Sequence, residues 1–167
     1  MSESEAPVLE QKHTSPLKIL MVDDEDVFPE EIAPELREQG YECETASDGE
    51  RGLKLAASFL PDVVLCDLMM PRMNGDMVLR KLTERIPATQ VIMITAYGTL
   101  DGAVDSFRNG ACDYLLKPVI IEDLLAKIER IKNERQLRTE VQQLRQIVSE
   151  QHWTSSAKVR PFSRQPD

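Results

Sequence analysis

The 167-residue sequence lacks the features of a membrane-spanning or disulfide-stabilised secreted protein. No apolar run approaches the about 20 residues that cross a bilayer. The first fifteen residues are polar and acidic, unlike a signal peptide. The three cysteines, Cys43, Cys66 and Cys112, are widely spaced and contain no C-x-x-C pair, so they indicate neither a disulfide framework nor a zinc site. We therefore expect a soluble cytoplasmic protein whose cysteines are reduced and behave as small hydrophobic residues.

The sequence also lacks an excess of positive charge. It carries 20 Lys and Arg against 29 Asp and Glu, a formal net charge of −9, which argues against electrostatic nucleic-acid binding. Residues 1–119 hold 22 acidic and 11 basic residues, whereas residues 120–167 hold 7 and 9. The basic tail residues Lys158, Arg160 and Arg164 are too few to indicate DNA binding. A phosphate loop of the form G-x-x-x-x-G-K-[ST] is also absent, which excludes that class of nucleotide-binding protein.

The sequence does contain a regular alternation of short apolar runs and helix-length amphipathic stretches. The runs cover 18–23, 41–46, 63–67, 90–95 and 113–117, and the amphipathic stretches cover 26–39, 48–59, 75–85 and 100–109. Continuous apolar runs are typical of strands buried on both faces, whereas 41–46 alternates and predicts an edge strand. The alternation predicts an α/β domain with a parallel, doubly wound sheet. Pro34 conflicts with the first helix, so we expect a kink or a late helix start there.

The last predicted helix begins near Ile121 and continues beyond the domain. Its apolar residues form two sets with 4-3 spacing, separated by a six-residue step: Leu124, Ile128 and Ile131, then Leu137, Val141, Leu144 and Val148. The first set can pack on the domain, but the second has no surface there to cover it. We expect a folded domain over 17–130 and a helical extension over 131–150 that forms a short dimeric coiled coil; a helix folded back on its own sheet is the alternative. Residues 1–16 and 151–167 are predicted to be a flexible leader and a disordered tail.

Polar side chains that can carry chemistry gather at the carboxyl ends of the predicted strands. Asp23 and Asp24 end the first strand, Asp67 the third, Thr95 the fourth and Lys117 the fifth. These ends meet at one edge of a parallel sheet, where doubly wound folds bind their ligands. Each residue alone is also typical of a helix cap or a solvated turn. Their convergence is what favours a site.

This set of side chains suits phosphoryl chemistry. Three neighbouring carboxylates repel one another, and a hard cation such as Mg²⁺ relieves that repulsion. A metal beside a carboxylate, with an amine and a hydroxyl opposite, can hold a phosphoryl group, whose transfer needs mainly positioning and charge neutralisation. Asp67 is the best candidate for a nucleophile that forms an acyl phosphate, because it ends the strand that is predicted to be central.

Four motifs occur in order between residues 17 and 130. They are Val22-Asp-Asp-Glu25, Asp67-Leu-Met-Met-Pro-Arg-Met-Asn-Gly75, Thr95-Ala-Tyr-Gly98 and Asp113-Tyr-Leu-Leu-Lys-Pro118. With these motifs the chain resembles the receiver domain of two-component response regulators. The resemblance implies a flavodoxin-like five-stranded sheet of order 2-1-3-4-5. It also implies that Asp67 accepts a phosphoryl group from a histidine kinase, a phosphotransfer protein or a small phosphodonor.

The resemblance further implies roles for individual residues. The implied Mg²⁺ ligands are Asp23, Asp24, Asp67 and the backbone carbonyl of Met69. Thr95 would hydrogen-bond the phosphoryl group and Lys117 would pair with it. Tyr114 would turn inward as Thr95 moves, which would change the surface formed by 100–109, 113–117 and the helix from residue 121. The segment from Ala96 to Val104 and the long last helix most resemble nitrogen-regulator-type receivers.

Other functions remain as alternatives. An aspartate-nucleophile phosphatase of the haloacid-dehalogenase type would need a second acid two residues after Asp67, where this chain has Met69. The chain is therefore not expected to be an enzyme. A phosphorylation-independent coiled-coil scaffold and a truncated receiver of a larger transcriptional activator stay open. Met69 and Tyr97 are bulky and offer no group that orients water, so we expect the phosphoaspartate to decay slowly.

Overall fold

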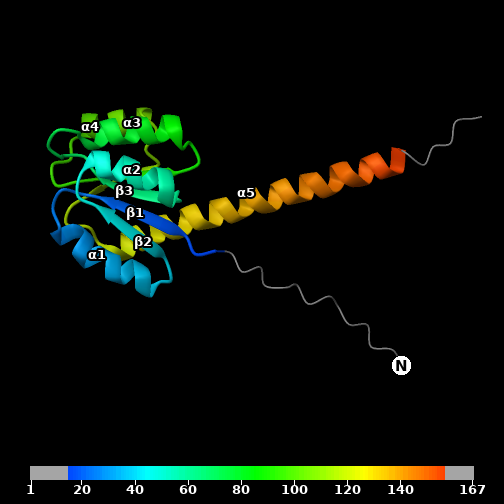
Figure 1. The fold of residues 1–167 in the computed structure, drawn as a ribbon, viewed down its shortest axis with the longest axis horizontal. Coiled ribbons are helices and arrows are strands. Elements are labelled where there is room, and N and C mark those ends of the chain that lie inside the picture. The colour runs from blue at the N-terminus through cyan, green and yellow to red at the C-terminus, as the bar shows by residue number, and fades with distance from the viewer. Residues whose placement is uncertain (1–14, 157–167) are drawn as a thin grey trace, which may run out of the picture. The chain divides into compact units, whose positions relative to one another are not determined.

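A computed structural model describes the backbone of residues 15–156 and the side chains of residues 15–151 (Figure 1). The strands are β1 (Lys18–Val22), β2 (Glu42–Ala46), β3 (Val63–Asp67), β4 (Gln90–Thr95) and β5 (Asp113–Leu116). The helices are α1 (Val27–Glu38), α2 (Gly49–Phe59), α3 (Gly75–Arg85), α4 (Leu100–Arg108) and α5 (Ile121–Ser156). Up to α4 and β5, each predicted element agrees with the observed one to within a residue at either end. The predicted leader up to residue 14 and the tail from residue 157 lie outside the described residues.

The five strands form one parallel sheet in the order β2-β1-β3-β4-β5, as predicted. The strand order reverses beside β1, which is the point where such sheets place their sites. All five residues of the central strand β3 are buried, which explains its uninterrupted apolar run. β2 lies at an edge and is half exposed, in agreement with its alternating sequence.

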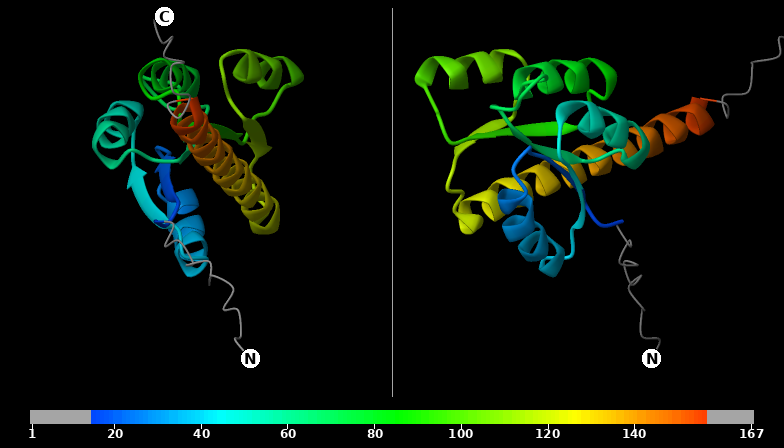
Figure 2. Two further views of the ribbon diagram at one scale, coloured as in Figure 1. Left: turned by 90° about the vertical axis from the view of Figure 1, so that its right-hand side faces the viewer. Right: turned by 60° about the vertical axis from the view of Figure 1, so that its left-hand side comes forward.

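Helices cover both faces of this sheet, with α1 on one face and α2 and α3 on the other (Figures 1 and 2). The core between the sheet and the α2–α3 layer includes Leu20, Val64, Cys66, Leu79 and Met93. The intervening strand residues Ile19, Met21, Leu65, Ile92 and Ile94 point to the other face and are also buried. A rigid two-sided core therefore holds the carboxyl ends of the strands in place.

Local capping explains where three of the helices begin. Asp48 precedes α2 and its carboxylate accepts a hydrogen bond from the Arg51 amide. Asn74 and Thr99 cap α3 and α4 in the same way. These side chains satisfy amides that have no partner within the first helical turn.

Pro34 does not delay the first helix. α1 begins at Val27 and continues through Pro34 to Glu38, so the expected late start is wrong. Phe28, Ile32 and Leu36 are buried along one side of this helix. Burial of this apolar face stabilises the helix despite the hydrogen bond that proline removes.

The cysteines behave as hydrophobic residues rather than as reactive thiols. All three lie in the described part of the chain and none is in a disulfide. Cys43 and Cys66 are buried, and Cys112 is half-buried. Burial raises the pKa of the Cys43 thiol to about 11 and raises that of Cys66 further. Neither of these two thiols is a nucleophile at neutral pH.

The chain divides into two compact units, residues 1–121 and 122–167, and the second is dominated by α5. α5 is a single 36-residue helix that continues to Ser156, six residues past the expected end of the extension. Its first apolar set, Leu124, Ile128 and Ile131, is buried, whereas the second set is exposed. Within residues 15–156 no helix is long and apolar enough to cross a membrane.

Candidate functional site

The carboxyl ends of β1, β3 and β5 bring three carboxylates and an ammonium group together. Carboxylate oxygens of Asp23, Asp24 and Asp67 all lie within 4.8 Å of one another. The Lys117 Nζ is 2.7 Å from Asp23 Oδ2 and 3.2 Å from Asp67 Oδ2. Asp23 and Asp67 are buried, whereas Asp24 is exposed. The cluster is thus open to solvent on the side of Asp24.

Backbone amides fix the orientation of the two buried carboxylates. Asp67 Oδ1 accepts a hydrogen bond from the Met69 amide at 3.0 Å, and Asp23 Oδ1 accepts one from the Glu25 amide at 2.9 Å. In each case the donor lies two residues after the aspartate, in the loop that follows the strand. The other oxygen of each carboxylate is held by Lys117. Both side chains therefore have one oxygen on the backbone and one on the lysine.

The electrostatics of the cluster favour a bound cation. Burial raises the pKa of the Asp67 carboxyl and the Asp23 carboxylate raises it further, whereas the Met69 amide and Lys117 only partly oppose this. Burial alone would lower the pKa of Lys117, but its hydrogen bonds to the two carboxylates outweigh this and raise it. The lysine is therefore charged at neutral pH. One ammonium cannot neutralise three carboxylates, so the donor set suits a hard divalent cation.

Gly75 allows the loop after β3 to close tightly beside Asp67. Its amide donates to the Leu68 carbonyl at 2.9 Å. A Cβ atom at this position would overlap the Asp67 carbonyl oxygen and would lie 2.8 Å from the Leu68 Cα. The sequence indicates only a glycine that suits a turn at a helix join, and its φ is not positive. Close backbone approach is the reason that glycine is needed here.

Thr95 and Tyr114 lie on the neighbouring strands β4 and β5, where Thr95 pairs with Leu116 and Tyr114 pairs with Met93. Thr95 is fully buried at the end of β4, one residue beyond Ile94, which pairs with Asp67. Its hydroxyl accepts a hydrogen bond from the Tyr97 amide at 3.2 Å, and its carbonyl accepts one from the Lys117 amide. The Tyr114 hydroxyl is buried beside the Thr99 backbone without a well-formed hydrogen bond, and burial raises its pKa.

One contact at the site could not be found from the sequence. The Lys117 Nζ lies 5.3 Å from the centre of the Phe28 ring, within the range of a cation–π interaction. Phe28 is buried in the first turn of α1. The amphipathic pattern indicates only a core residue at this position, and it lies 89 positions from the lysine in the sequence. No local signal identifies such a contact.

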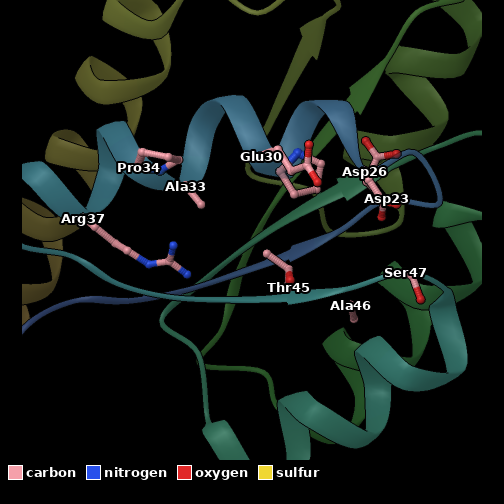
Figure 3. Close-up of a pocket in the computed structure, with 10 residues that line it drawn as sticks. Asp23, Asp26, Glu30, Ala33, Pro34, Arg37, Thr45, Ala46 and Ser47 are labelled. Carbon is pink, nitrogen blue, oxygen red and sulfur yellow. The ribbon is translucent and has the colours of Figure 1, made fainter.

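A cavity of about 390 Å³ begins at Asp23 and runs between α1 and β2 (Figure 3). Its lining includes Asp26, which precedes α1, Glu30 and Arg37 of α1, Thr45 of β2, and Ser47, which follows β2. The Arg37 guanidinium, which lines the cavity, donates to the Cys43 carbonyl at 3.1 Å. Among the residues that line the cavity, Asp23 alone also belongs to the carboxylate cluster. The cavity therefore lies beside the cluster and is not part of it.

The fold and the site define a class of protein: a doubly wound α/β domain with an aspartate cluster at the carboxyl edge of its sheet. Residues 19–129 match the family model of the response regulator receiver domain, and the chain belongs to this family. Receiver domains in this family are phosphorylated on an aspartate, bind Mg²⁺ and interact with histidine kinases or phosphotransfer proteins.

Two curated relatives are longer regulators from Escherichia coli. The chain is 36% identical over 132 residues to the regulatory protein AtoC, covering 79% of this chain and 29% of AtoC. It is 38% identical over 112 residues to the DNA-binding transcriptional regulator NtrC, covering 67% of this chain and 24% of NtrC. The nitrogen-regulator-type resemblance is therefore confirmed. The chain spans less than a third of the length of either relative.

The chain is also similar to solved structures of receiver domains. The crystal structure of a CheY-like response regulator receiver domain protein from Methanospirillum hungatei aligns with a TM-score of 0.69 and 33% identity. The alignment covers 73% of this chain and 98% of that chain.

Proposed function

We propose that the protein is a phosphorylation-dependent response regulator in which Asp67 is the phosphoacceptor. The observation that carries the proposal is the bridge formed by Lys117 between Asp67 and Asp23, inside a cluster of three carboxylates. Asp67 differs from Asp23 and Asp24 because it is the last residue of the central strand β3, whereas those two follow the end of β1.

The transfer itself needs little beyond this geometry. A carboxylate oxygen of Asp67 attacks the phosphorus atom of a phosphohistidine or an acyl phosphate. The new P–O bond gives an acyl phosphate on Asp67, and the leaving nitrogen or oxygen keeps the electron pair of the broken bond. Lys117 lies where it can pair with a phosphoryl oxygen, and the Thr95 hydroxyl can donate to another. The reaction is a single modification of the protein and includes no turnover of a separate substrate.

The carboxylate cluster fits the Mg²⁺ that such transfer requires. Asp23, Asp24 and Asp67 would hold the ion, together with the backbone carbonyl of Met69. When bound, it supplies positive charge that neutralises the phosphoryl oxygens. The exposed position of Asp24 leaves a solvent-facing side from which a phosphodonor can approach.

Phosphorylation would be read out through the buried hydroxyl of Thr95. A new phosphoryl group adds about −1.5 to −2 charges and three acceptor oxygens. The Thr95 hydroxyl, which accepts from the Tyr97 amide, keeps its own proton and would move toward these oxygens to donate it to one of them. Its movement makes room for Tyr114, whose own hydroxyl has no well-formed partner to lose. The surface of α4 and β5, on which Leu100, Phe107 and Leu116 are exposed, would change as a result.

The output proposed for this change is dimerisation or binding of a protein partner. The second apolar set of α5, from Leu137 to Val148, is exposed and suits a second copy of the same helix. A histidine kinase or phosphotransfer protein would supply the phosphoryl group. The acidic charge of residues 1–119 argues against direct nucleic-acid binding by this part of the chain.

Intact mass spectrometry tests the proposal. Wild type and Asp67→Asn are incubated with acetyl phosphate, with and without Mg²⁺, and each sample is also sized. We expect a Mg²⁺-dependent gain of about 80 Da in wild type and none in the variant. An equal gain in Asp67→Asn would show that another residue is modified. No gain in wild type with either acetyl phosphate or a phosphorylated histidine kinase would favour the scaffold alternative.

A further inference from the structure

We propose that Asp76 is a positioning residue of the Thr95–Tyr114 switch, and that its carboxylate accepts a hydrogen bond from the Tyr114 hydroxyl once Asp67 is phosphorylated. This inference rests on the proposed function and adds a partner for the tyrosine after it has turned inward. Three kinds of observation support it: buried oxygen atoms that lack a partner, the packing around Tyr114, and the charge beside its hydroxyl.

Three buried side-chain oxygens within residues 15–151 have no hydrogen-bond partner: Asp76 Oδ1, Ser106 Oγ and the Tyr114 hydroxyl. A polar atom in the interior loses its hydrogen bonds to water, so one that gains no others destabilises the fold, and such atoms are rare. A carboxylate oxygen accepts hydrogen bonds, and a tyrosine hydroxyl can donate one. Asp76 and Tyr114 are therefore complementary, because each lacks what the other offers.

Helix capping does not account for the burial of Asp76. This residue lies in the first turn of α3, where a negative charge is favourable beside the free amides. The cap itself is Asn74, whose side-chain oxygen accepts a hydrogen bond from the Met77 amide at 3.0 Å. A carboxylate that only complements a helix terminus can stay in solvent, whereas Asp76 Oδ1 is buried. The burial of this oxygen therefore needs another explanation.

The packing of the sheet against α3 places Tyr114 near the first turn of that helix. Tyr114 pairs with Met93 across β4 and β5, and both pack in the core between the sheet and the α2–α3 layer. The Met93 Cε lies 2.8 Å from a Cβ atom built on Gly75, the residue before Asp76. Met93 therefore lies between the tyrosine and the start of α3.

The Tyr114 ring lies beside the start of α4 in this structure. Its hydroxyl is 3.8 Å from a Cβ atom built on Gly102, and its Cε1 is 3.5 Å from one built on Gly98. Burial raises the pKa of the hydroxyl, the Thr99 backbone opposes this in part, and the negative charge of Asp76 raises the pKa further. The two side chains thus interact electrostatically without being hydrogen-bonded.

An inward turn of Tyr114 brings the two groups together. Thr95 and Met93 are two residues apart on β4 and face the same side of the sheet. Space left by Thr95 lets the ring move away from Gly102 and along Met93, toward the start of α3. The hydroxyl then donates to Asp76 Oδ1, and one hydrogen bond satisfies both atoms. Because this bond forms only after the turn, it stabilises the phosphorylated state.

The hydroxyl proton of Tyr114 gives a direct test in the full-length chain. Tyrosine labelled with ¹³C at Cζ is incorporated, and NMR spectra are recorded in equal parts of H₂O and D₂O. A slowly exchanging hydroxyl splits the Cζ signal into protonated and deuterated forms, whereas a rapidly exchanging hydroxyl gives one averaged signal. Tyr114→Phe identifies the signal of Tyr114. We expect this signal to be averaged in untreated wild type and split after acetyl phosphate and Mg²⁺ are added, because a buried hydrogen bond slows proton exchange.

Three variants separate Asp76 from other acceptors. Asp76→Leu removes the acceptor without leaving a large cavity, and the split should be lost after phosphorylation. Asp76→Asn keeps a carbonyl oxygen and should retain the split. Ser106→Ala removes another buried oxygen that lacks a partner, and as the matched control it should also retain the split. Intact mass of each sample reports whether Asp67 has been phosphorylated.

The outcomes separate this inference from the proposed function. A split that persists in Asp76→Leu would show that the hydroxyl donates elsewhere, and loss of the split in Ser106→Ala or Asp76→Asn would contradict Asp76 as the acceptor. An averaged signal in phosphorylated wild type, or a split before phosphorylation, would overturn the inference while the gain in mass upholds the proposed function. Wild type that gains no mass with either phosphodonor would refute both.

Discussion

At the scale of single residues, the tightest steric constraint on the site comes from Gly75. A methyl group there would collide with the main chain of Asp67, the last residue of β3, and of Leu68, the residue after it, and this backbone cannot move aside without disturbing the sheet. Gly75→Ala should therefore lower the free energy of unfolding by about 2 kcal/mol and slow phosphorylation, because relief of the overlap displaces Asp67. Denaturant unfolding and the rate of the mass gain measure the two effects.

Gly40→Ala is the matched control for that change. Gly40 has a φ of 87° and nothing within 4 Å of a built Cβ atom, so alanine there adds backbone strain without a collision. It should destabilise the chain by about 1 kcal/mol and leave phosphorylation at the wild-type rate. Equal phosphorylation of both variants would show that Gly75 has no influence on the site.

Two exposed residues beside the site are expected to influence the lifetime of a phosphoaspartate. Met69 and Tyr97 lie two residues after Asp67 and Thr95, and both are largely exposed. Neither carries an acid or an amide that could orient water for attack on an acyl phosphate. We expect a phosphoaspartate half-life above about one minute at neutral pH, and Met69→Asn should shorten it by at least about tenfold. The decay of the phosphorylated mass after removal of the phosphodonor measures both.

Residue contacts across the fold were the least predictable part of the site. Asp23, Asp24, Asp67, Thr95 and Lys117 could be predicted to converge because each follows a strand, and strand ends meet at one edge. The Phe28 ring near Lys117 could not, because this contact depends on how α1 packs on the sheet. The reason for Gly75 was also hidden, since a sequence shows a glycine but not the backbone that approaches it.

At the scale of elements, the strands and short helices were predictable to within a residue. Short apolar runs that are typical of strands alternate cleanly with amphipathic stretches that have the period of a helix. β3 is buried on both faces and α2, α3 and α4 each begin at a capping side chain that is visible in the sequence. α5 continues six residues past its predicted end. The polar composition after position 150 favours disorder, but residues 121–160 contain neither glycine nor proline, so nothing in the sequence stops the helix at the expected residue.

The exposed half of α5 gives a prediction for the whole element. Truncation after Arg130 removes Leu137–Val148 and keeps the buried residues Leu124 and Ile128. We expect the shortened chain to be monomeric and still phosphorylated, because the removed residues lie outside the carboxylate cluster. Sizing and intact mass report the two properties.

A full-length Leu137→Ser/Leu144→Ser variant is the control for truncation. It keeps the chain length and replaces only the two d-position leucines, and it should also be monomeric. An unchanged oligomeric state in both proteins would place the dimer contact elsewhere in the chain.

At the scale of the whole molecule, chemistry and assembly are assigned to different parts of the chain. The acidic residues are concentrated in residues 1–119, which hold the carboxylate cluster, whereas residues 120–167 carry slightly more basic than acidic residues. This division was visible in the sequence, as was the fold class, because charge and periodicity are both properties of long segments. Individual distances were not visible in the sequence. A difference of a few ångströms in packing decides whether neighbouring carboxylates bind a cation or remain solvated.

The edge strand β2 has a consequence for behaviour at high concentration. Glu42 and Glu44 alternate along this strand and are both exposed. If the β2 strands of two molecules met edge to edge, their unpaired backbone groups could join the two sheets, but the glutamates of both molecules would be brought together and would repel. The strand thus carries its own protection against sheet extension and aggregation. A domain that must remain available to successive phosphodonors gains from an edge that resists such irreversible contacts.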